Sequence, residues 1–123
     1  MHATDRSLKS LQAIQLSADE NKMLQWLRGA SWEPQTDARD PIPYKAKVPE
    51  FFGGVRLYRV QASGASSGGH NALDLFIKKL EYQGCITKQG LYPLVVQNGA
   101  RFLLLKKVDL ENIGVGKSDD EDE

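Results

Sequence analysis

The sequence Leu-Tyr-Pro-Leu-Val-Val-Gln-Asn-Gly-Ala-Arg-Phe-Leu-Leu-Leu-Lys-Lys-Val, residues 91–108, gives the clearest indication of the fold. Two apolar runs, 91–97 and 101–108, flank the dipeptide Asn98-Gly99. Asn-Gly favours a two-residue β-hairpin turn, because both central positions of that turn need a positive φ. The stretch therefore predicts a C-terminal hairpin. Its apolar runs are unusually continuous for half-buried strands, so we expect this chain's helices or a partner to cover both faces.

Two helices are predicted ahead of this hairpin. Ser17 and Glu20 have the spacing of a Ser-x-x-Glu capping box, which indicates a helix from Ala18 to about Leu27. Apolar residues at helical spacing predict a second helix from Ala72 to near Gly84. Both helices have one apolar face, so each is expected to pack against a sheet.

Two further strands complete the predicted order. Alternating apolar residues indicate a strand over about 54–62, and 85–87 are interpreted as a short strand. The order becomes helix, long loop, strand, helix, short strand, hairpin. It predicts an α/β or α+β fold, with a small mixed sheet of about four strands packed by two helices.

The length of 123 residues suits a single globular domain. Residues 17–113 are assigned to that domain, after a flexible N-terminal segment, 1–16, and before a disordered acidic tail, 114–123. Within the domain, 31–49 holds four of the five prolines. Proline disfavours both a helix interior and a central strand, so this segment is predicted to be a long loop or arm.

Charge is distributed unevenly along the chain. The formal net charge is zero, with 16 basic and 16 acidic residues, but five of the acids form the unbroken run Asp119–Glu123. The rest of the chain therefore has 11 acidic residues against 16 basic ones. Such a run is expected to act as an autoinhibitory competitor for a basic surface or to recruit a basic partner.

The sequence also excludes several classes of protein. Cys85 is the single cysteine, so no intrachain disulfide or multi-thiolate metal site can form. No apolar run approaches the length of a membrane span, which is about 20 residues. We therefore expect an intracellular, soluble protein of the cytoplasm or nucleus that does not bind membranes, and we expect neither cofactor nor metal.

A glycine- and serine-rich turn precedes the second predicted helix. Backbone N–H groups at the start of a helix attract anions, and the two glycines allow a phosphate or carboxylate to approach closely. The candidate anion-binding residues are Ser66, Ser67, Gly68, Gly69, His70 and Asn71.

This turn resembles the strand-loop-helix motif of bacterial-type peptidyl-tRNA hydrolases. The shared residues are Gly68-Gly69-His70-Asn71 and their immediate neighbours, about 20 residues in all. The resemblance implies that Asn71 contacts a substrate. The family's N-terminal Gly-Leu-Gly-Asn-Pro-Gly turn is absent from this chain, as is a counterpart of the acidic residue that orients the catalytic histidine. The chain therefore lacks the general base arrangement that ester hydrolysis requires.

Basic residues on the predicted strands and helices suggest binding to nucleic acid. The candidates are Arg56, Arg59, Lys78, Lys79, Lys88, Arg101, Lys106 and Lys107. The favoured hypothesis is a non-catalytic, nucleic-acid-associated protein. One alternative is an adaptor or small subunit that contacts a protein partner or a second copy through the hairpin and the N-terminal segment. A second alternative is a hydrolase acting at the Gly-Gly-His-Asn turn.

Overall fold

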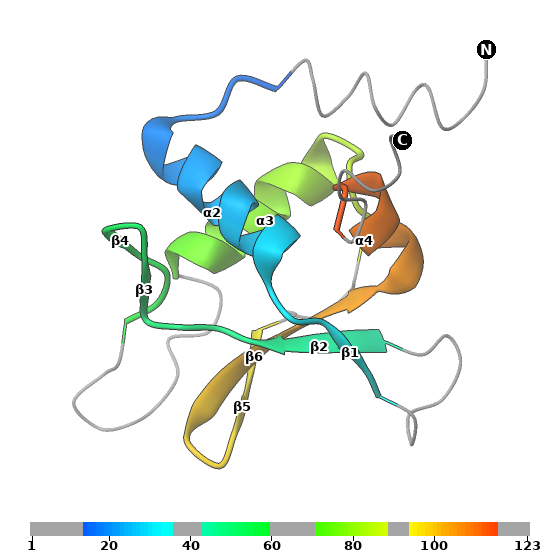
Figure 1. Ribbon diagram of the computed structural model, residues 1–123. Coiled ribbons are helices and arrows are strands. Elements are labelled where there is room, and N and C mark those ends of the chain that lie inside the picture. The colour runs from blue at the N-terminus through cyan, green and yellow to red at the C-terminus, as the bar shows by residue number, and fades with distance from the viewer. Residues whose placement is uncertain (1–13, 36–42, 60–70, 89–93, 116–123) are drawn as a thin grey trace, which may run out of the picture.

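The computed structural model describes residues 14–35, 43–59, 71–88 and 94–115, which form an α+β fold (Figure 1). Three helices and six strands lie within these ranges. The helices are α2 (Ala18–Gly29), α3 (Ala72–Tyr82) and α4 (Lys107–Asn112). The strands are β1 (Glu33–Pro34), β2 (Pro43–Lys47), β3 (Phe51–Phe52), β4 (Val55–Arg56), β5 (Leu94–Gln97) and β6 (Ala100–Lys106).

The main sheet has four antiparallel strands in the order β1-β2-β6-β5, and β3 and β4 form a separate two-stranded sheet. All three helices that the structure describes lie on one side of the main sheet (Figure 1). The predicted fold class is confirmed: a small sheet of four strands includes the C-terminal hairpin and packs against helices. The helix α4 is an addition to the two predicted ones.

The hairpin forms where the sequence predicts it. Asn98 and Gly99 have φ values of 52° and 78°, as a two-residue turn of this kind requires. β5 pairs with β6 from Leu94 opposite Leu103 to Gln97 opposite Ala100. The second strand ends earlier than expected, at Lys106, and Val108 lies in α4 instead of the strand.

The capping box of α2 is also confirmed. The Ser17 hydroxyl accepts a hydrogen bond from the Glu20 backbone N–H at 3.1 Å, and the Ser17 N–H donates to the Glu20 carboxylate at 2.9 Å. The helix buries Met23, Leu24 and Leu27 against the core. These bonds fix where α2 begins and therefore which face it turns to the sheet.

The expectation that the Pro-rich segment would exclude a central strand is wrong for Pro43–Lys47. These residues form β2, which lies between β1 and β6. Proline lacks an N–H group but keeps its carbonyl, and the Pro43 carbonyl accepts a hydrogen bond from the Gln35 N–H at 2.9 Å. Pro49 follows the strand. Pro43 begins β2 opposite Lys106, so no proline interrupts this strand after its first residue, while 36–42 lies outside the described residues.

Two other strand predictions need correction. Among the described residues of 54–62, Val55–Arg56 alone pairs as a strand, and its partner is β3. Leu57 then turns inward and accepts a hydrogen bond from the Leu73 N–H, while residues 60–62 lie outside the described ranges. The segment 85–87 forms no strand: Cys85 closes the end of α3 by donating from its N–H to the Leu80 carbonyl at 2.8 Å.

The core lies between the helices and the inner side of the main sheet. It joins residues of α2 and α3 to Ala46 of β2 and to Leu103 and Leu105 of β6.

Of the predicted N-terminal segment, only residues 14–16 are described, and Ile14 and Leu16 pack against this core. Residues 116–123 of the acidic tail lie outside the described ranges. None of the described helices has the length and apolar character needed to cross a bilayer.

Candidate functional site

The side of the main sheet that faces away from the helices carries basic and aromatic side chains. Along β6, Arg101, Leu103 and Leu105 are buried, while Phe102 and Leu104 between them are only partly buried. The strand register sets Lys45 opposite Leu104 and Lys47 opposite Phe102. Residues paired in this way share a face of the sheet. We call the surface formed by Lys45, Lys47, Phe102, Leu104 and Lys106 the open sheet face.

Two of its lysines have different surroundings. The Lys45 ammonium lies 4.5 Å from the centroid of the Phe102 ring and donates a hydrogen bond to the Gln97 side-chain oxygen at 3.0 Å. A cation over an aromatic face is attracted by the ring electrons, so these contacts hold Lys45 on the sheet. Lys47 is exposed. The open sheet face therefore presents one anchored and one exposed positive charge beside an aromatic ring.

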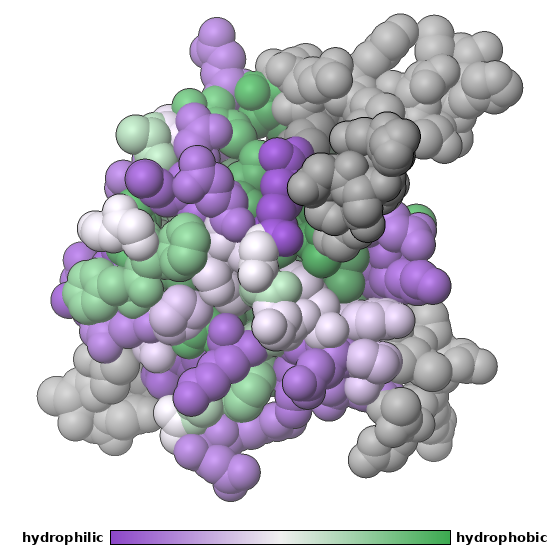
Figure 2. Space-filling model, in the orientation of Figure 1, coloured by the Kyte–Doolittle hydropathy of each residue, from purple (hydrophilic) through white to green (hydrophobic). Residues whose placement is uncertain are grey.

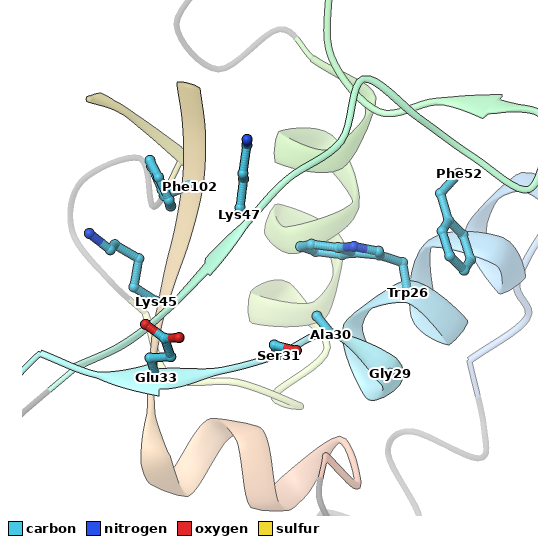
Figure 3. Close-up of a pocket in the computed structure, with 9 residues that line it drawn as sticks. All are labelled: Trp26, Gly29, Ala30, Ser31, Glu33, Lys45, Lys47, Phe52 and Phe102. Carbon is cyan, nitrogen blue, oxygen red and sulfur yellow. The ribbon is translucent and has the colours of Figure 1, made fainter. Parts of the chain in front are cut away.

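A pocket of about 510 Å³ adjoins this face where β1 ends. β1 pairs with β2 only from Glu33 opposite Lys45 to Pro34 opposite Tyr44. Within the described residues, the β2 edge at Lys47 therefore has no strand beside it on that side, and the end of α2 and β3 close the space. The lining residues are Trp26, Gly29, Ala30, Ser31, Glu33, Lys45, Lys47, Phe52 and Phe102 (Figure 3).

Aromatic side chains form the walls of the pocket. Trp26 comes from α2, while Lys45, Lys47 and Phe102 come from the sheet (Figure 3). Only 5% of Trp26 is exposed, and its ring packs at a tilt against Trp32, with centroids 6.1 Å apart. The Trp32 indole N–H donates to the Leu27 carbonyl at 2.9 Å, so this wall is held by both packing and a hydrogen bond.

The β3–β4 hairpin borders the pocket on the opposite side. Gly53 and Gly54 form its turn with φ values of 61° and 84°, a conformation that glycine adopts without strain. This turn places Phe52 at the pocket and leaves Phe51 half-exposed. Figure 2 shows hydrophobic groups over the hairpin beside hydrophilic ones. The pocket thus combines aromatic walls with two ammonium groups and one carboxylate, that of Glu33, a composition that suits a flat group carrying negative charge.

Three of the predicted basic residues are engaged within the protein. Arg101 is 5% exposed, and its guanidinium lies 4.6 Å from the centroid of the Tyr58 ring, so it is not part of a basic surface. Arg56 forms an ion pair with Glu50. The Lys79 ammonium donates to the Glu20 carboxylate at 2.9 Å and to the Gln15 carbonyl at 3.1 Å.

The other predicted basic residues are divided between sites. Lys78 and Lys88 line a second pocket with Glu81 and the exposed Tyr82. Lys106 belongs to the open sheet face, while Arg59 and Lys107 are exposed elsewhere. The structure therefore does not bring the eight predicted residues together on one surface.

Of the predicted anion-binding turn, the structure describes Asn71 alone. This residue is 3% exposed, and its side-chain oxygen accepts a hydrogen bond from the Arg59 backbone N–H at 3.0 Å. This bond joins the segment after β4 to the start of α3. Asn71 therefore supports the fold at this junction, and Ser66, Ser67, Gly68, Gly69 and His70 lie outside the described residues.

Reactive groups are few among the described residues. Cys85 is buried, and burial raises the pKa of its thiol, which disfavours the nucleophilic thiolate. Within 14–35, 43–59, 71–88 and 94–115, no three His, Cys, Asp or Glu side chains lie together as metal ligands would. The described lining of the Trp26 pocket contains neither histidine nor cysteine.

Comparisons of the chain with protein-family models, with curated proteins and with solved structures found no match.

Proposed function

We propose that this protein binds single-stranded nucleic acid without converting it, and that the open sheet face and the adjoining Trp26 pocket form the binding surface. One observation carries the proposal: Lys45 and Lys47 lie beside Phe102 on the side of the sheet that faces away from the described helices. Proteins that bind single strands combine basic groups for the phosphates with aromatic rings for the bases.

Each part of the surface has a distinct role in this proposal. The exposed Lys47 meets a phosphate directly. Lys45 leaves the Phe102 ring for a neighbouring phosphate as a base stacks in its place. A second base enters the pocket beside Phe52. A stacked base contributes about 1–3 kcal/mol by alanine substitution, so Phe102 and the lysines are expected to supply comparable parts of the affinity.

The test compares two pairs of lysines. We expect the Lys45→Ala/Lys47→Ala variant to bind a fluorescent oligothymidylate about tenfold more weakly at low salt. The log-log salt slope is expected to fall by roughly 0.7 for each lost phosphate contact. The matched control, Lys78→Ala/Lys88→Ala, removes the same charge from the second pocket and is expected to bind as the wild type does. Fluorescence anisotropy across a salt series measures both quantities.

Two outcomes would contradict the proposal. Equal losses in the two variants would mean that only the total charge attracts the oligonucleotide. An absence of binding by the wild type at low salt would eliminate nucleic acid as the ligand. A duplex of the same length serves as the comparison, since rigid pairing hides the bases from an aromatic surface.

A second proposal, an adaptor role, is favoured by the outer strand of the hairpin. β5 is an edge strand of the main sheet, and Val96 on it is 46% exposed. An exposed edge is a place where another strand can pair. Light scattering of the wild type and of Val96→Lys tests this role: a wild-type oligomer that the lysine dissociates supports it, and a wild-type monomer counts against self-association.

A further inference from the structure

We infer that the acidic run Asp119–Glu123 docks on the open sheet face at Lys45 and Lys47, where it competes with a polyanionic ligand. The docking itself is argued from the fold and from charge. Its consequence for binding rests on the proposed function. The occupant is a named segment of this chain, and three observations lead to it.

The first observation is the place where the described chain ends. Ile113, just after α4, is fully buried, and its carbonyl accepts a hydrogen bond from the Arg28 side chain at 2.6 Å. Gly114 lies beside the same guanidinium. The Val115 N–H then donates to the Leu110 carbonyl at 2.9 Å. These contacts fix the exit of the chain against the last turn of α2.

The second observation is that this same turn leads into the pocket. Arg28 is followed directly by Gly29, Ala30 and Ser31, which line the pocket that contains Lys45 and Lys47. Consecutive Cα atoms are about 3.8 Å apart, so the Arg28 side chain that contacts Ile113 and Gly114 comes from a residue directly beside the pocket wall. The eight residues 116–123 span at most about 28 Å when extended, which is comparable to the diameter of a domain of this size.

The third observation is charge complementarity. The run carries five adjacent carboxylates. The open sheet face carries Lys45, Lys47 and Lys106, and Glu33 is the acidic residue among the described lining of its pocket. The second pocket also has two lysines and one acidic residue, Glu81, but it is not lined by the end of α2. Lys106 adds a third basic residue to the open sheet face, and the end of α2 contacts the exit of the chain, so the lysines of this face are the better match for the run.

The tether makes a weak contact effective. A segment joined by a short linker reaches a local concentration in the millimolar range, so even a millimolar affinity for the lysines populates the docked state substantially. Competition of this strength is expected to weaken the binding of an oligonucleotide about threefold to tenfold at low salt. Salt is expected to weaken docking as well as ligand binding, because both depend on the same lysines.

The test neutralises the run without changing its length. In the variant, Asp119, Asp120 and Asp122 become Asn, and Glu121 and Glu123 become Gln. NMR spectra of the two full-length chains are compared without any ligand. We expect amide shift differences at Lys45, Lys47 and Phe102 that disappear in high salt. We also expect the neutralised chain to bind labelled oligothymidylate threefold to tenfold more tightly than the wild type.

The outcomes separate this inference from the proposed function. Shift differences at the open sheet face without oligonucleotide binding by either chain would support docking and eliminate the nucleic-acid role. An absence of shift differences at low salt would overturn docking, whatever the oligonucleotide does. Differences confined to Lys78, Tyr82 and Lys88 would also overturn it, since they would place the run at the second pocket. The same comparison in the Lys45→Ala/Lys47→Ala background gives independent support. There, neutralising the acidic run is expected to leave the low-salt amide shifts of the open sheet face unchanged.

Discussion

Glu20 joins two helices through one carboxylate. It accepts hydrogen bonds from the Ser17 N–H at 2.9 Å, at the start of α2, and from the Lys79 ammonium of α3 at 2.9 Å. The pKa of Glu20 lies below its usual value, first because of the backbone bond from Ser17 and next because of the bond from Lys79. Both contacts are stronger with an ionised carboxylate, so the charge of Glu20 stabilises the folded state.

The pH dependence of this contribution has a definite sign. Since the folded state lowers the pKa of Glu20, the stabilisation is complete above the unfolded value, near 4.5, and is lost as the pH falls through the folded value. Glu20→Gln keeps the reach of the side chain but not its charge. We expect the variant to be less stable than the wild type near neutrality and the difference to shrink in acid. Urea denaturation of both proteins at about pH 7 and about pH 3 measures this difference in unfolding free energy. A difference of the same size at both pH values would contradict the prediction.

The elements depend on backbone conformation at their ends, and two glycines provide a matched comparison. Gly99 in the β5–β6 turn has a φ of 78°, whereas Gly29 ends α2 without a positive φ; at neither position would an added Cβ contact atoms beyond the local backbone and chain neighbours within 4 Å. Gly99→Ala is expected to lower the free energy of unfolding by about 1–2 kcal/mol through backbone strain alone. Gly29→Ala is expected to raise it slightly, by up to about 1 kcal/mol. Thermal unfolding of both variants checks this, and equal effects would refute the backbone argument.

The same elements explain what the sequence could predict. The Asn98-Gly99 turn and the Ser17–Glu20 box are local signals, and each forms as predicted. β2 is hard to predict because the surrounding prolines obscure its Lys-Ala-Lys-Val alternation, residues 45–48, although Pro43 is the only proline in the strand and stands at its first position. Phe102 was missed as a site residue because the apolar run around it conceals which side chains face outward. That distinction depends on pairing with β2, a contact distant in sequence.

At the scale of the whole molecule, the two sides of the main sheet have different surroundings. Leu103 and Leu105 of β6 pack into the core with Phe76 of α3, whereas Phe102 lies on the opposite side with Lys45 over its ring. Burial of apolar surface is the main source of stability in a domain of this size. The inner side is therefore expected to hold the fold, and the open sheet face is available for binding.

This division predicts that two phenylalanines behave differently when each is shortened to alanine. Phe76→Ala leaves a cavity in the core and is expected to cost about 3–5 kcal/mol of stability. Phe102→Ala removes a partly exposed ring and a cation–aromatic contact worth about 0.5–1 kcal/mol, so its melting temperature is expected to fall by only a few degrees. Its affinity for oligothymidylate is nevertheless expected to fall by about tenfold, since stacking is lost. Calorimetry and anisotropy on the same preparations separate the two effects. A Phe102→Ala variant that loses stability as Phe76→Ala does would place that ring in the core, and one that keeps full affinity would remove it from the binding surface.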